Sequence, residues 1–106
     1  MPTIAKDSQV QTVITTYEMT PGTAQALMDA LTDAYAAFIS KQPGFVGAGL
    51  HINDAQTRIA SYSQWQRRED FLAVLRTDEM RERNGKFSEL CKSFEPVMYD
   101  VTEAFG

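Results

Sequence analysis

The chain has 106 residues and a formal net charge of −4, which fits one domain around one hydrophobic core. Its ten basic residues are scattered, whereas a nucleic-acid-binding protein needs clustered Lys and Arg, so we do not expect that function. Cys91 is the single cysteine, so no intramolecular disulfide is possible. Neither a signal peptide nor a run of ~20 apolar residues that could span a membrane is recognised, and we expect a cytoplasmic protein.

In the first half of the chain, the spacing at which apolar residues recur changes once. Residues 1–9 carry no period and predict a disordered leader, and residues 10–106 are expected to form a single domain. Residues 10–19 are rich in Val, Ile, Thr and Tyr and predict a strand. Apolar residues then recur every three or four positions over residues 22–42, which predicts an amphipathic helix that ends at the dipeptide 43–44, Pro-Gly.

The second half begins with a predicted hairpin. Residues 45–52 and 57–65 read as strands joined by a short polar turn. Residues 66–76 and 78–94 predict two helical segments, and residues 97–105 predict the last strand. The order β-α-β-β-α-β predicts an α+β, ferredoxin-like domain whose antiparallel sheet carries its helices on one face.

The other face of this sheet has no predicted helix to cover it. The last strand places Val97, Tyr99, Val101 and Phe105 on one side, and this side is too apolar to face solvent. We therefore expect a homodimer in which the open sheet faces of two copies pack together.

Strand alternation divides the segment Ser61-Tyr62-Ser63-Gln64-Trp65 between the two faces. We expect Ser61, Ser63 and Trp65 to line a ligand cavity under the helices, with the indole N–H as a hydrogen-bond donor. The alternative is that Trp65 only packs between sheet and helices. Tyr62 has the opposite parity and is expected in the dimer interface.

His51 is the only histidine, and imidazole suits a general base because it titrates near neutral pH. Alternation places it on one side of its strand with Phe45, Gly47 and Gly49, beside a groove that the glycines leave open. The alternative is a strand-end histidine that faces solvent.

Several further side chains are candidates for ligand contact. Tyr35 and Phe38 belong to the apolar stripe of the first helix and can close a cavity from above. Arg81 and Arg83 can hold a carboxylate or phenolate, although a charged helix face in solvent is the better explanation of them. One His and one Cys without ligand spacing predict no metal site.

The order of elements, the Pro43-Gly44-Phe45 turn, and the strand ending in Trp65 before a charged helix with Phe71 resemble the antibiotic biosynthesis monooxygenase (ABM) family. The resemblance implies a dimeric α+β barrel. It is greatest with the small cofactor-independent oxygenases that convert anthrone-type phenols to quinones.

In those oxygenases a Trp closes the third strand, and Trp65 matches it. A His on the second strand is matched by His51, and an Arg of a later helix by Arg81 or Arg83. Ser61 stands where they have Asn, and Phe71 where they have Tyr.

The resemblance implies a cofactor-independent monooxygenase that oxidises a polycyclic phenol, an anthrone-type compound or a hydroquinone with O2 to a quinone. The alternatives are a non-oxidative cyclase or isomerase of a polyketide-like substrate, and a ligand-binding protein without catalysis. The predicted catalytic residues are Trp65, His51 and Ser61, and the predicted substrate-binding residues are Ser63, Phe71, Tyr35, Phe38 and Arg83.

Overall fold

The computed structural model describes residue 4 and residues 10–106 of the chain. The predicted leader over residues 1–9 therefore lies, apart from Ile4, outside the described residues. The elements in chain order are β1 (Gln11–Glu18), α1 (Pro21–Ala37), the short 3-10 helix η1 (Ile39–Lys41), β2 (Phe45–Ile52), β3 (Arg58–Trp65), α2 (Arg68–Leu75), α3 (Asp78–Leu90) and β4 (Ser93–Tyr99).

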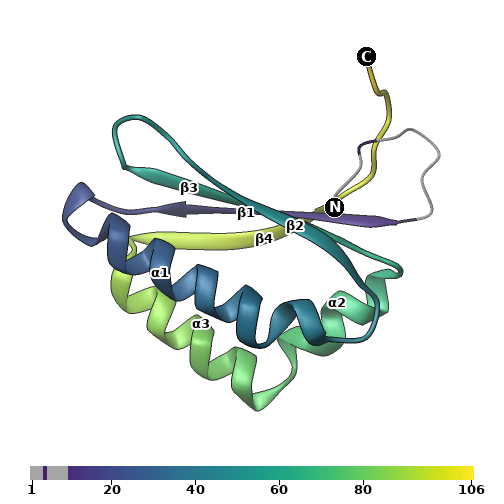
Figure 1. Cartoon of the computed structure of the whole chain (residues 1–106), viewed down its shortest axis with the longest axis horizontal. Coiled ribbons are helices and arrows are strands. Elements are labelled where there is room, and N and C mark those ends of the chain that lie inside the picture. The colour runs from purple at the N-terminus through teal and green to yellow at the C-terminus, as the bar shows by residue number, and fades with distance from the viewer. Residues whose placement is uncertain (1–3, 5–9) are drawn as a thin grey trace.

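The described strands form one antiparallel sheet in the order β2-β3-β1-β4, with all three α-helices on the same face of it (Figure 1). This arrangement confirms the predicted α+β, ferredoxin-like fold. The sheet face opposite the helices carries no helix within the described part of the chain (Figure 1).

Helix α1 supplies one side of the core. Pro21 occupies its first turn, where a missing backbone N–H costs nothing, and Leu27 and Leu31 lie fully buried on its inner stripe. The predicted helix over residues 22–42 is too long, because Phe38 leaves helical geometry with φ −133° and a 3-10 turn follows. Gly44 completes the turn into β2 with φ +85°, and a Cβ there would collide with the Asp70 carboxylate.

The end of the chain differs most from the prediction. Helix α3 stops at Leu90 instead of residue 94, and β4 begins at Ser93 instead of residue 97. The reason is pairing with β1, which brings the Phe94 ring onto Tyr17 in a stacked contact with 5.0 Å between centroids. Pro96 is tolerated inside β4 because β4 is an edge strand.

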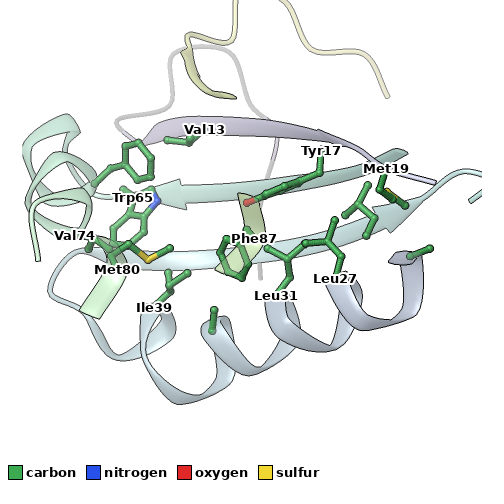
Figure 2. Packing of buried hydrophobic residues seen from close by; sticks show 14 residues of the cluster. Val13, Tyr17, Met19, Leu27, Leu31, Ile39, Trp65, Val74, Met80 and Phe87 are labelled. Atoms are coloured by element: carbon green, nitrogen blue, oxygen red, sulfur yellow. The ribbon is translucent and has the colours of Figure 1, made fainter. Parts of the chain in front are cut away.

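Alternation places the odd-numbered residues of β1 and β3 under the helices. Val13, Tyr17 and Trp65 are buried there against the helical layer (Figure 2). Ile59 of β3 is buried in the same cluster. The division predicted for residues 61–65 follows the same rule, with Ser61, Ser63 and Trp65 inward.

Strand β2 breaks the alternation with a bulge between Phe45 and Gly47. Phe45 pairs with Trp65 and lies on the helix side, whereas His51 pairs with Ala60 on the open side. The prediction that Phe45 and His51 share one side is therefore wrong, because a bulge shifts the parity by one residue.

Candidate active site

A cavity of about 80 Å³ lies between the helix side of the sheet and the three α-helices. Its wall combines strands β1, β3 and β4 with all the helices, so distant parts of the sequence meet there. The lining residues are Thr15, Tyr17, Leu31, Tyr35, Ile39, Ser63, Trp65, Phe71, Val74, Leu75, Met80, Asn84, Phe87, Phe94 and Pro96.

Trp65 is the largest side chain in this wall and is only 1% exposed. Its ring meets Phe45 edge-on at 5.3 Å and Phe71 at 5.8 Å between centroids. The indole N–H donates a hydrogen bond of 3.1 Å to Ser63 Oγ. Trp65 therefore both lines the cavity and packs between sheet and helices, and its orientation is fixed from three sides.

A second hydrogen bond joins α1 to the sheet behind the cavity. The Tyr35 hydroxyl and Ser61 Oγ lie 2.5 Å apart, and Ser61 is 2% exposed and does not line the cavity. Burial raises the pKa of Tyr35, although hydrogen bonds with Ser61 and Ser63 partly oppose the shift. Tyr35 is therefore a neutral hydrogen-bonding group at physiological pH.

Tyr17 on β1 is the second phenol of the wall. Burial is the main cause that raises its pKa, and the neighbouring Tyr35 and Cys91 add to the shift. No Asp, Glu, His, Lys or Arg lines the cavity among the described residues. The site is thus neutral and largely apolar, with hydroxyl, amide and indole groups as its polar contacts.

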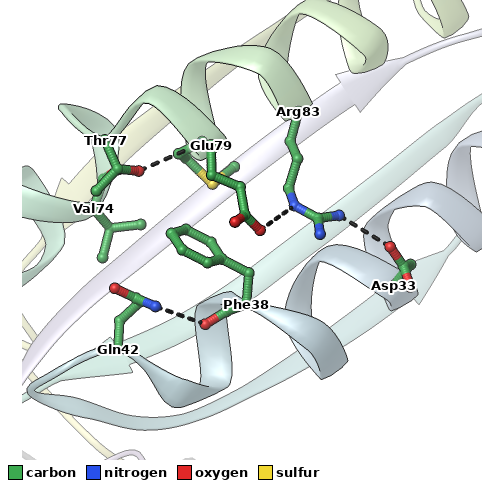
Figure 3. Close-up of polar contacts among 8 residues, drawn as sticks. Asp33, Phe38, Gln42, Val74, Thr77, Glu79 and Arg83 are labelled. Carbon is green, nitrogen blue, oxygen red and sulfur yellow. Dashed lines mark hydrogen bonds and ion pairs between the residues drawn. The ribbon is translucent and has the colours of Figure 1, made fainter.

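Besides Ser61, three predicted site residues, His51, Phe38 and Arg83, do not line the cavity. His51 is exposed on the open side of the sheet, separated from the cavity by the sheet itself. Phe38 packs partly buried at the end of α1, where its carbonyl accepts a hydrogen bond from Gln42 Nε2 (Figure 3).

Arg83 does not line the cavity, and it reaches from α3 towards α1. Its guanidinium binds the Asp33 carboxylate of α1 at 3.0 Å and the Glu79 carboxylate at 3.1 Å (Figure 3). These contacts account for Arg83 as a link between α1 and α3. The exposed Arg81 is also absent from the cavity wall.

The structure adds polar residues that the sequence reasoning did not single out. The Thr15 hydroxyl and the Asn84 amide both line the cavity. The helical period contains a signal for Asn84, because Asn84 falls between the apolar residues Met80 and Phe87 on one side of α3.

A shallow groove of about 410 Å³ lies on the outer side of Tyr35, between α1 and β2. Tyr35 lines both this groove and the inner cavity, so its side chain forms part of the partition between them. The other groove residues are Thr32, Ala36, Ser40, Phe45, Ala48, Gly49 and Leu50.

Among the described residues, no group of three His, Cys, Asp or Glu side chains is placed to hold a metal ion. Within the same residues, no helix has the length and apolar character needed to cross a membrane.

Comparison with solved structures shows the same fold in several oxygenases. SnoaB, a cofactor-independent oxygenase from Streptomyces nogalater, has 17% identity and a TM-score of 0.78, covering 92% of this chain and 97% of that one. The ActVA-Orf6 monooxygenase of Streptomyces coelicolor, solved with nanaomycin D, has 22% identity and a TM-score of 0.75, covering 91% and 89%.

An anthrone oxidase-like protein has 19% identity and a TM-score of 0.88, covering 95% of this chain but 43% of its own. No curated protein matches the chain by sequence. The family profile described as "Antibiotic biosynthesis monooxygenase" matches residues 10–85, most of the chain. The chain therefore belongs to the antibiotic biosynthesis monooxygenase family, as its sequence resemblance predicted.

Proposed function

We propose that this protein is a cofactor-independent oxygenase that converts an anthrone-type phenol or a hydroquinone to a quinone with O2. The observation that carries the proposal is the buried, neutral, aromatic-walled cavity in which Ser63 and its neighbours fix Trp65. Apolar walls with a few fixed polar groups are typical of sites for flat aromatic ligands. SnoaB is an oxygenase and the ActVA-Orf6 protein a monooxygenase, and their shared fold with this chain supports the same class of reaction.

The reaction balances without an added reductant when the substrate supplies the electrons. An anthrone CH2 group loses two hydrogen atoms, one oxygen atom of O2 becomes the new carbonyl, and the other leaves as water. The substrate first loses a proton to give a stabilised anion, and this anion reduces O2. The protein must therefore hold the anion and exclude bulk water.

The described cavity wall offers donors and no base. Tyr17 and Tyr35 are neutral because burial raises their pKa, and no carboxylate or imidazole lines the cavity. In this proposal the substrate loses its proton to bulk water before it enters the cavity, which suits a phenol or anthrone that ionises readily by itself. His51 receives no catalytic role, because it lies on the opposite face of the sheet.

The substrate needs more room than the cavity of about 80 Å³ gives. Ligand sites for molecules of several rings commonly measure ~300–1,000 Å³. Rotation of Tyr35 out of its bond with Ser61 would join the cavity to the outer groove of about 410 Å³. We infer that Tyr35 moves when the ligand binds, as gating side chains of enclosed sites do.

The proposal includes a homodimer through the open sheet faces. Val97 is 36% exposed and Tyr99 48% exposed on this face, although both are large apolar side chains. Packing against a second copy would bury them together with Ile14 and Tyr62.

Oxygen uptake tests the proposed reaction directly. Purified protein is mixed with dithranol, a 1,8-dihydroxyanthrone, and O2 consumption and quinone absorbance are followed against the protein-free rate. We expect one quinone for each O2 consumed, at a rate proportional to protein concentration. Uptake equal to the spontaneous rate would exclude this substrate class, and it would leave a cyclase or a binding protein as the better explanation.

A further inference from the structure

Asn84 breaks the apolar pattern of the inner side of helix α3. Met80 precedes it by four residues and is 6% exposed, and Phe87 follows by three and is 2% exposed. Asn84 thus occupies the inward stripe, and it lines the cavity together with these two neighbours. An apolar residue is the usual occupant of such a position.

The Asn84 amide has no hydrogen-bond partner among the described residues. Ser88 Oγ donates a hydrogen bond to the backbone carbonyl of Asn84, and this bond does not involve the Asn84 side chain. By contrast, Thr77 at the N-cap of α3 and Arg83, which directly precedes Asn84, both have side-chain partners. Asn84 is half-buried, so solvent can reach its amide, and a ligand in the cavity would replace that solvent as the partner.

Two other polar groups of the wall are already bonded. The Tyr35 hydroxyl is bonded to Ser61 Oγ behind the wall, and Ser63 Oγ accepts the Trp65 indole N–H. A carboxamide has both a donor and an acceptor, so it can bind a carbonyl or phenolate oxygen through N–H and a phenol O–H through its oxygen. A flat aromatic with an oxygen at its edge supplies the partner that Asn84 lacks.

We propose that Asn84 is a substrate-binding residue that hydrogen-bonds an edge oxygen of the aromatic ligand from helix α3. This inference rests on the proposed function for its ligand class. It places the oxygen-bearing edge towards α3 and the aromatic face towards Trp65. Neither contact requires Ser61.

The test measures binding without oxidation, using 1-naphthol and naphthalene as a pair that differs by one hydroxyl. Calorimetric titration is made with the wild type and with Asn84→Leu. We expect Asn84→Leu to weaken 1-naphthol binding roughly 3- to 10-fold, the effect of one lost neutral hydrogen bond, and to leave naphthalene binding unchanged or tighter. The matched control is Gln25→Leu, which removes an exposed amide from α1.

Urea unfolding of the same variants provides a second readout. Asn84→Leu should be as stable as the wild type or more stable, because leucine suits the inward stripe better than an unpaired amide. Equal weakening of both ligands, no change in either, or a wild type that binds neither would overturn the role of Asn84. If Asn84→Leu weakens 1-naphthol binding as expected but the wild type takes up no oxygen with dithranol, only the oxygenase reaction is contradicted.

Discussion

The hydrogen bond between Tyr35 and Ser61 gives a quantitative prediction about the cavity wall. Tyr35→Phe removes the hydroxyl that is bonded to Ser61 Oγ. Ser61 is only 2% exposed, so its hydroxyl is left buried without this partner. A buried hydroxyl without a partner costs about 1–3 kcal/mol, so the free energy of unfolding should fall by that amount. For a domain of this size the melting temperature should fall by roughly 4–8 °C per kcal/mol.

Urea unfolding of Tyr35→Phe, Ser61→Ala and the double variant would measure this coupling. We expect the double variant to lose about 1 kcal/mol less than the sum of the single losses, because its second change removes a group already unpaired. The matched control is Tyr62→Phe on the open face, where the hydroxyl accepts only a 3.4 Å bond from Gln64, and its loss should stay below about 0.5 kcal/mol. If the losses of the two single variants simply add up in the double variant, the Tyr35–Ser61 hydrogen bond does not stabilise the contact between α1 and β3.

The remaining predictions concern the reaction and the dimer. Trp65→Phe should lower the dithranol-dependent oxygen uptake roughly tenfold or more, because the fixed indole is lost, and an unchanged rate would leave Trp65 with a packing role only. His51→Ala should keep the rate and its pH profile within about twofold, since His51 lies across the sheet from the cavity, and a larger loss would extend the site to the open face. Val97→Lys should shift the sedimenting mass from two chains to one, whereas a wild-type mass of one chain would exclude the proposed interface.

Local patterns predicted the centre of the fold more accurately than its end. The strand over residues 45–52 and the inward sides of Ser61, Ser63 and Trp65 follow from alternation and turn residues. The start of β4 could not be predicted from such local patterns. Ser93-Phe94-Glu95-Pro96 resembles a helix end locally, and only pairing with β1 makes it a strand.

The bulge in β2 shows how one residue changes a prediction about the site. Alternation over an unbroken strand would put His51 on the side of Phe45, and thus near Trp65. The extra residue between Phe45 and Gly47 reverses the sides, so the only histidine lies away from the cavity. A single sequence contains no clear signal for such a bulge, because its glycines are also compatible with a regular strand.

Ser61 shows why a position that departs from a family pattern must be judged with its spatial neighbours. Its hydroxyl is bonded to Tyr35 on another element, so it serves the contact between α1 and the sheet. An unpaired amide is found instead on α3, at Asn84, across the cavity from that strand. If Asn84 binds the ligand oxygen, the polar contact has moved from strand to helix while Trp65 keeps its place, and the substrate is held with its oxygen-bearing edge towards α3.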